Sequence, residues 1–311
     1  MVRNRQFILG AALLLAFPVL ALSDSPPAVR TVVVVASLGV EAHRSAIEGM
    51  QAALGKSSSQ VRMVDLAEAR SGLAAGVRLA TPGTRVIIAI GSEALQIVEA
   101  ERPTAPVIGT MILRNTPEPH PAPGPTATVS LDITLTNLLA RLKALFPEKT
   151  RLGIIRNPAL GGLNAVPLPP RSQVQGFTVR VVDCVGAEQL LAALESLKGQ
   201  VDFVWCLPDG ALYNSATIKP LILASIENRL PLIGFSESFT RAGAAVGIYP
   251  DFRDIGMQTG ELALQVLEGQ PMRGPEGPRR LKVAVNQSVF RLLGLHYAPA
   301  AADSGEFSIL R

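Results

Sequence analysis

Apolar positions in the first half of the chain form short continuous runs, separated by segments with helical spacing. Thr31–Ala36 is apolar at nearly every position, which is typical of a strand buried on both faces of a parallel sheet. Glu41–Leu54 then carries apolar residues such as Ile47 and Met50 at helical spacing and ends at Gly55. The same alternation predicts strands at Val61–Val64, Arg85–Ile90 and Pro106–Thr110, and helices at Leu66–Leu79 and Glu93–Ala100.

The alternation stops and then restarts in the second half of the chain. Thr116–Pro125 has a proline at every second position and is predicted to form a stiff, extended loop. Beyond it, strands are predicted at Ala127–Leu131, Arg151–Arg156, Phe177–Val182, Asp202–Leu207, Pro231–Phe235 and Ala244–Ile248, and helices at Thr134–Phe146, Ala187–Lys198 and Ile218–Asn228. Strands that alternate with helices in this way predict an α/β fold with two doubly wound parallel sheets.

The N-terminal segment has the organisation of a secretory signal. Arg3 and Arg5 precede the apolar run Phe7–Leu15, and small residues follow as far as Ser23. The run is shorter than the roughly 20 residues that a membrane-spanning helix needs, and Pro18 interrupts it. We therefore expect a signal peptide over residues 1–23, cleaved near Ser23 or after Ala21, and an exported protein. No later segment is expected to cross a membrane.

Composition limits the class of protein. The chain has 311 residues, of which 48% are hydrophobic, so it is predicted to bury a large core rather than to be disordered. It has 29 basic and 25 acidic residues, a formal net charge of +4. No basic stripe appears beyond Arg279, Arg280 and Lys282, which argues against binding of nucleic acid.

Two cysteines, Cys184 and Cys206, are expected to remain free thiols. Neither follows the apolar N-terminal run, so a lipid anchor is not predicted. In a wound sheet of order 2-1-3-4-5, the second and third strands lie on either side of the first. Cys184 would end the second strand and Cys206 would lie in the third, about 9–10 Å apart. A disulfide needs Cα atoms within roughly 7 Å.

Sequence motifs give little support for catalysis. The three histidines, His43, His120 and His296, are widely spaced and are interpreted as surface residues, and no metal-ligand spacing or phosphate-binding loop occurs, so no metal or cofactor is predicted. Gly234–Ser238 nearly matches the nucleophile turn Gly-x-Ser-x-Gly, with Ser238 in place of the last glycine. A secreted serine hydrolase, with His296 as its base, is therefore an alternative function.

Polar residues follow the predicted strands at their carboxyl ends, where wound α/β sheets bind ligands. These candidate ligand-binding residues are Ser37, Ser92, Glu93, Thr110, Asn157, Asp209, Tyr213, Ser236, Glu237 and Tyr249. The backbone N–H groups of Ser92 and Glu93 could bind a carboxylate, and Asp209 or Glu237 could hold an ammonium. Ser92 could instead cap its helix, and Asp209 could simply turn the chain at Asp209-Gly210.

Several segments resemble one family of proteins. "RVIIAIGSEA" at Arg85–Ala94 and "FPEKTRLGIIRNP" at Phe146–Pro158 are similar to segments of tryptophan/tyrosine-type periplasmic substrate-binding proteins of ABC transporters. The resemblance continues through Val201–Gly210 and Arg229–Gly269 to "LKVAVNQSVFRLLGL" at Leu281–Leu295. The segments cover most of the chain in the family's order. The sequence departs from the family's pattern at Gly210-Ala211 and at Ser37-Leu38-Gly39.

The resemblance implies a type I periplasmic binding protein, in which two wound lobes are joined by three crossovers. It implies a first lobe of residues 24–130 and 250–270 and a second lobe of residues 131–249 and 271–311. It also implies roles for Ser92, Asp209 and Glu237, which match polar positions of the family's loops. The implied function is to capture a small polar, amino-acid-like ligand between the lobes for the permease and ATPase of an ABC importer, as a monomer. A sensor module for a membrane receptor is an alternative.

Overall fold

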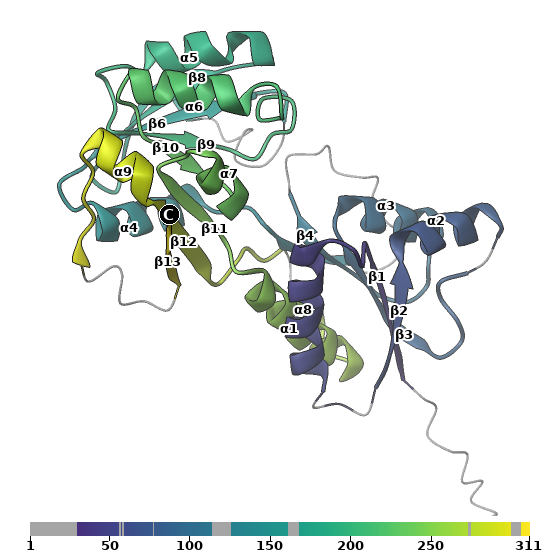
Figure 1. The fold of residues 1–311 in the computed structure, drawn as a ribbon. Coiled ribbons are helices and arrows are strands. Elements are labelled where there is room, and N and C mark those ends of the chain that lie inside the picture. The colour runs from purple at the N-terminus through teal and green to yellow at the C-terminus, as the bar shows by residue number, and fades with distance from the viewer. Residues whose placement is uncertain are drawn as a thin grey trace, which may run out of the picture.

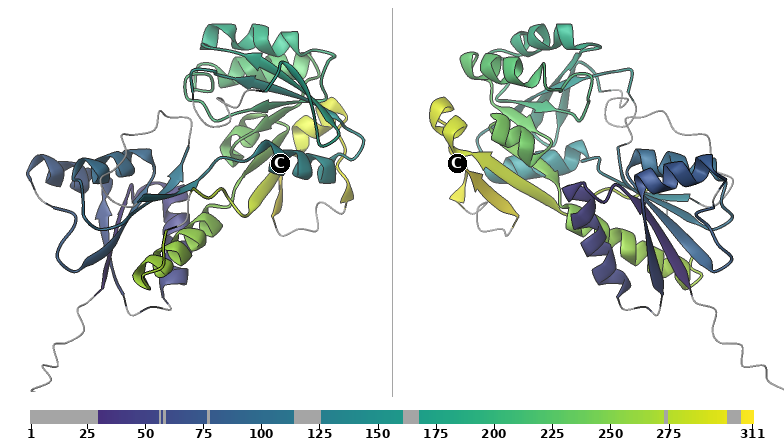
Figure 2. Two further views of the ribbon diagram at one scale, coloured as in Figure 1. Left: turned by 180° about the vertical axis from the view of Figure 1, so that it is seen from behind. Right: turned by 45° about the vertical axis from the view of Figure 1, so that its right-hand side comes forward.

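The chain folds into two lobes, each built on one β-sheet with helices on both faces (Figure 1). The computed structural model describes residues 30–55, 57, 59–76, 78–113, 126–160, 168–272, 275–299 and 306–311. The expected signal peptide and the proline-rich segment, with its His120, lie outside these residues. Figure 2 shows from two further sides that, in the part of the chain that the structure describes, narrow connections join the lobes.

The first lobe contains a five-stranded parallel sheet of order β2-β1-β3-β4-β5. Its strands are β1 (Thr31–Ala36), β2 (Gln60–Asp65), β3 (Thr84–Ile90), β4 (Val107–Ile112) and β5 (Thr126–Ser130). Alternate positions of β1 face opposite layers. Val32 and Val34 pack with α1 (Glu41–Leu54) and α8 (Phe252–Leu267), whereas Val33 and Val35 pack with α2 (Leu66–Ala74) and α3 (Ser92–Ala100).

The second lobe contains an eight-stranded sheet of order β13-β12-β11-β10-β9-β6-β8-β7. Its strands are β6 (Arg151–Arg156), β7 (Arg171–Val174), β8 (Phe177–Asp183), β9 (Phe203–Cys206), β10 (Leu232–Gly234), β11 (Val246–Pro250), β12 (Leu281–Asn286) and β13 (Phe307–Leu310). The central strands, from β8 to β11, are parallel, while β7 and β12 run antiparallel to β8 and β11. The predicted order 2-1-3-4-5 is confirmed for β6, β8, β9, β10 and β11.

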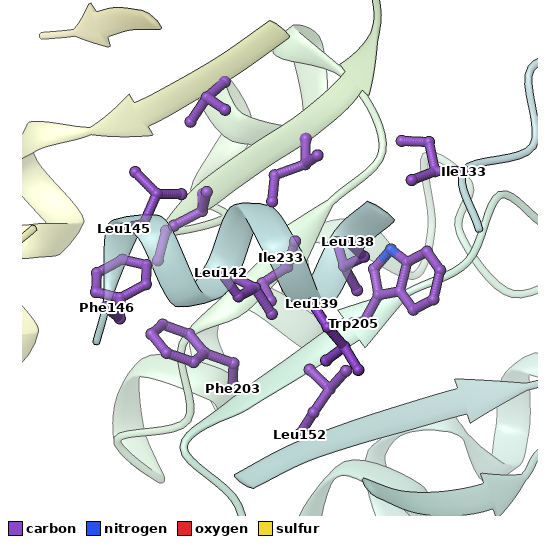
Figure 3. Close-up of a cluster of buried hydrophobic side chains, with 14 of the residues drawn as sticks. Ile133, Leu138, Leu139, Leu142, Leu145, Phe146, Leu152, Phe203, Trp205 and Ile233 are labelled. Carbon is purple, nitrogen blue, oxygen red and sulfur yellow. The ribbon is translucent and has the colours of Figure 1, made fainter. Parts of the chain in front are cut away.

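Helices cover both faces of this second sheet. On one face lie α4 (Leu135–Leu145) and α9 (Gln287–Leu293), and Figure 3 shows α4 directing its leucines onto the sheet with Trp205 beside the N-terminal half of the helix. On the other face lie α5 (Leu190–Ser196), α6 (Ile218–Glu227) and α7 (Glu237–Ala242), and a short 3₁₀ turn at Ala187–Gln189 precedes α5. Cys184 and Cys206 lie on this side of the sheet, buried and free, as the strand order predicts.

Helices α1 and α8 pack through glycines at unusually close range. A Cβ atom at Gly49 would lie 1.9 Å from the Arg253 carbonyl oxygen, and one at Gly256 would lie 1.8 Å from the Ala46 carbonyl oxygen. Side chains at these positions are therefore incompatible with the observed helix separation. This contact fixes α8, which comes late in the sequence, to a helix that comes at its beginning.

Hydrogen bonds fasten the connections between the lobes to the neighbouring strands. The Leu131 N–H donates to the Ile112 carbonyl at 2.8 Å, and the Asp251 N–H donates to the Arg280 carbonyl at 3.1 Å. Glu276 extends the first sheet beyond β5, because its carbonyl accepts the Ser130 N–H at 2.8 Å. The chain thus passes between the lobes at three adjacent places, before α4, before α8 and before β12.

Within the described residues, none of the helices combines the length and the hydropathy that a bilayer span requires. The same part of the chain contains no group of three or more His, Cys, Asp or Glu side chains arranged to hold a metal ion.

Candidate functional site

The carboxyl ends of the strands in both lobes lead to a pocket beside the connections between the lobes. This interlobe pocket has a volume of about 240 Å³. Residues of β9 and β11 and of the loops that follow the strands of the second sheet form one part of its wall, namely Trp205, Leu207, Pro208, Phe235, Ser236, Ile248 and Pro250. The connection between β5 and α4 and the ends of first-lobe elements form the rest, namely Leu113, Leu131, Asp132, Ile133 and Phe252. The lining is therefore mostly apolar, with a few polar groups.

The strand pattern explains how Trp205 reaches this pocket. Successive side chains of β9 point to opposite faces, so Phe203 and Trp205 lie on the α4 side while Val204 and Cys206 lie on the other. Trp205 is 2% exposed and belongs to the second-lobe core. Its ring is held by packing and lies at the boundary between that core and the pocket.

Asp209 and Asn157 form a buried hydrogen-bonded pair at the carboxyl edge of the second sheet. Asn157 Nδ2 donates to Asp209 Oδ2 at 3.1 Å, and Asp209 Oδ1 accepts the Ala211 N–H at 2.7 Å and the Leu212 N–H at 3.3 Å. Asp209 is only 6% exposed. Its carboxylate therefore holds the turn after β9, which was one of the two roles expected from the sequence.

Tyr213 lies behind the pocket and does not line it. Its ring packs against Phe235 and Phe239, with centroids 5.8 and 5.9 Å away, and its hydroxyl lies beside the Cys206 thiol. Burial raises the pKa of Tyr213 well above its usual value, with Cys206 adding to the shift. The side chain supports Phe235, which does line the pocket.

Ser236 and Glu237 open α7 at the edge of the pocket. Ser236 Oγ accepts the Phe239 N–H at 3.1 Å and thereby caps the helix. Glu237 forms an ion pair with Arg241 and accepts a hydrogen bond from the Tyr249 hydroxyl at 3.2 Å. Because Ile248 faces the pocket, its neighbour Tyr249 lies on the opposite face of β11. The structure thus brings Ser236 to the pocket and turns Tyr249 away from it.

The first-lobe candidates Ser37, Ser92 and Glu93 also differ in where their side chains lie. Ser37 follows β1, and its carbonyl accepts the Val40 N–H in the turn before α1. Ser92 begins α3, but the residue preceding the helix is Gly91 and no side chain caps this helix. Glu93 is paired with Arg70 of α2. Ser37 and Ser92 therefore stay at the carboxyl edge of the first sheet, while Glu93 contacts the neighbouring helix.

Thr110 is a core residue. It is 1% exposed, and its hydroxyl lies 2.7 Å from that of Thr259 in α8. Thr259 in turn donates to the Ile255 carbonyl at 2.8 Å, which leaves Thr110 as the donor in the pair. The hydroxyl of Thr110 therefore joins β4 to α8 inside the first lobe.

His43, expected at the surface, is half-buried at the carboxyl edge of the first sheet. A Cβ atom at Gly91 would lie 3.5 Å from its Cε1 atom, so the imidazole covers the start of α3. Burial lowers the pKa of His43, and the nearby backbone of Ser37 partly offsets the shift. The pattern of polar residues after the strands does not indicate His43, which lies on a helix, or the apolar residues Trp205 and Phe252.

Comparison with known proteins identifies the fold. The profile of ABC transporter substrate binding proteins matches residues 31–301. A substrate-binding protein with adhesive properties from Clostridium difficile, solved in a ligand-free, open form, has a TM-score of 0.62 and 16% identity over 91% of this chain and 99% of that one. The ABC domain in complex with L-Trp from Streptococcus pneumonia has a TM-score of 0.57 and 15% identity over 90% of this chain and 100% of that one. Both share the type I periplasmic binding protein fold with this chain.

One curated relative shows local sequence similarity. A tyrosine-binding protein from Clostridioides difficile (strain R20291) is 24% identical over 140 residues, which are 44% of this chain and 40% of that protein. The similarity thus spans less than half of the relative's length. The family profile, in contrast, covers most of the chain in the two-lobed region described above. The chain belongs to the family of ABC transporter substrate binding proteins.

Proposed function

We propose that this protein captures an amino-acid-like molecule with an apolar side chain between its lobes and presents it to an ABC importer. Membership of the substrate-binding family supports a small-molecule ligand and an ABC transporter as partner. Proteins similar to this chain include a tyrosine-binding protein and a structure in complex with L-Trp.

The observation that carries the proposal is the composition of the interlobe pocket. Apolar groups from both lobes surround a volume of about 240 Å³, and Asp132 and Ser236 add polar groups. Sites with mostly apolar walls and a few polar groups are typical of small-molecule binding. The sequence predicted a small polar ligand. The apolar walls favour a ligand that also carries an apolar group, as many amino acids do.

Ligand capture would act through closure of the lobes. A molecule that touches both walls interacts more strongly with the closed arrangement than with the open one, so binding favours closure. The affinity then reflects the contacts made in the closed form minus the free energy of closing. Nothing in this process changes the ligand covalently.

The test is to identify the ligand directly. Native mass spectrometry of the protein purified from its own cells should show a bound small molecule, and calorimetry of the stripped protein should show binding of apolar amino acids such as L-tyrosine or L-leucine. L-aspartate and L-lysine, which carry a charge where the apolar pocket lies, serve as matched controls. Binding of a sugar, or of charged amino acids only, would overturn the proposal.

The proposal includes export and a monomeric state. The signal-like N-terminal segment supports cleavage near Ser23 and a periplasmic location. Intact-mass measurement on the protein from the periplasmic fraction should give a chain that begins near Asp24. A full-length chain retained with the cells would contradict export. Light scattering on the same sample should give the mass of one chain.

A further inference from the structure

We propose that Phe252 is a specificity-determining residue, whose ring forms the first-lobe wall against which the apolar group of the ligand packs. This inference rests on the proposed function for the identity of the ligand, and on the structure for the pocket. Phe252 lines the interlobe pocket and is only partly buried. It also packs against the first-lobe core. Trp205 lines the same pocket from the second-lobe core.

The backbone of Phe252 is held firmly in place. It is the first residue of α8, and Asp251 Oδ1 caps this helix by accepting the Arg253 N–H at 3.0 Å and the Asp254 N–H at 3.4 Å. The glycine contacts at Gly256 then fix α8 against α1. A side chain on such a support presents its ring in a defined position, which is the condition for discrimination between ligands.

The pocket is large enough for an aromatic ring. An apolar cavity of about 150 Å³ in another protein binds benzene, and this pocket has about 240 Å³. A ring bound there would touch Phe252 of one lobe and Trp205 of the other. Aromatic pairs of this kind contribute attraction beyond the area that they bury. Loss of the Phe252 ring would therefore reduce affinity for aromatic groups more than for small ones.

The chain supplies its own probe of the pocket, because Trp205 is the single tryptophan of the sequence. In ¹⁵N-labelled protein, its indole N–H gives one side-chain signal that responds to occupancy. Titrations would use p-cresol, which is the side chain of tyrosine without its ammonium and carboxylate, together with L-tyrosine and L-alanine. The p-cresol titration examines the pocket whether or not amino acids are the ligands.

Phe252→Ala should weaken binding of p-cresol and L-tyrosine by roughly fivefold to tenfold, and binding of L-alanine much less. Phe252→Tyr should retain the affinity of the wild type. Met257→Ala is the matched control, since Met257 is 39% exposed on the same helix and does not line the pocket. Should Phe252→Ala not fold, Phe252→Leu keeps an apolar contact with the core and should shift preference from L-tyrosine towards L-leucine.

The outcomes separate the two proposals. Wild-type affinity for p-cresol in the folded Phe252→Ala or Phe252→Leu variant would overturn the role of Phe252, as would a Trp205 signal that p-cresol does not perturb in the wild type. If p-cresol binds in a Phe252-dependent manner and no amino acid binds, the proposed function fails and the role of Phe252 stands.

Discussion

Asp209 and Asn157 show how a single hydrogen bond changes the expected effect of a substitution. In Asp209→Asn, the amide oxygen can still accept the N–H groups of Ala211 and Leu212, but the new NH2 group then faces the Nδ2 group of Asn157. Two hydrogen-bond donors then face each other in a buried position. We expect the free energy of unfolding to fall by about 1–2 kcal/mol, measured by denaturant titration.

Two comparisons complete this test. Asp183→Asn removes a carboxylate from a surface ion pair with Arg156 and should cost less than about 0.5 kcal/mol. An Asp209→Asn protein as stable as the wild type would contradict the role of the carboxylate in the turn. The separate proposal that Asp209 contacts ligand predicts weaker binding of L-tyrosine by the same variant, because a charged hydrogen bond would be lost.

The Cys206 thiol gives a prediction for pH. Complete burial raises the pKa of Cys206 from its ordinary value of 9.0 to about 12, although the contact with Tyr213 acts in the opposite direction. Between these values the unfolded chain releases a proton that the folded chain retains, so stability falls as pH rises. We expect the free energy of unfolding to decrease from pH 9 upward, and Cys206→Ala to show a shallower decrease between pH 9 and 10.

Thiol labelling provides an independent measurement of the same property. At neutral pH, the folded protein should not react with iodoacetamide, because Cys184 and Cys206 are both buried and the pKa of each is raised by burial. The unfolded protein should show two free thiols. Rapid labelling of the folded protein, or a Cys184–Cys206 disulfide, would contradict this expectation.

At the scale of elements, buried parallel strands were the most predictable part. Thr31–Ala36 and Arg151–Arg156 were predicted with the bounds that the structure has, because continuous apolar runs have few other interpretations. The predicted C-terminal bound of the helix at Leu66–Leu79 is wrong. The helix ends at Ala74, shortly before Gly76, whose φ is 74°. A glycine in that conformation ends a helix, but its φ is not visible in the sequence.

Other elements could not be predicted, because they depend on partners elsewhere in the chain. The segment Leu281–Leu295 resembles the family, but the antiparallel direction of its strand β12 relative to β11 is a property of two strands and not of one apolar run. The interlobe pocket is a similar case. Ile133, Trp205 and Phe252 come together through the connections between the lobes, and none of the three belongs to the polar residues that follow the predicted strands.

The packing of α1 against α8 predicts a strong effect of one methyl group. In Gly256→Ala, the added carbon would lie 1.8 Å from the Ala46 carbonyl oxygen, so the helices must separate. We expect a loss of about 2–3 kcal/mol or more of stability, measured by thermal and denaturant unfolding. Gly39→Ala is the matched control, because no atom beyond residues 38–40 lies within 4 Å of its added carbon. Equal stability of the two variants would contradict the close packing.

At the scale of the whole molecule, the proposed closure predicts a change in shape. Among the described residues, the chain joins the lobes in the segments before α4, α8 and β12 (Figure 2), so the lobes can move as bodies about these connections. Small-angle scattering should give a smaller radius of gyration with saturating L-tyrosine than without it. L-aspartate, at the same concentration, is the control. An unchanged radius despite binding measured by calorimetry would contradict closure.

The contact between α1 and α8 also determines when the molecule can fold. As the chain is synthesised, β1 and α1 emerge early, but α8 follows only after the strands from β6 to β11 have been made. Until α8 is made, one face of the first sheet is covered by α1 alone. The second sheet lacks its edge strands β12 and β13 until these are made in turn. Contacts between distant segments slow folding and leave apolar surface exposed meanwhile. Neither lobe is complete until nearly the whole chain is available, so a growing chain offers a chaperone an extended period in which to hold it unfolded.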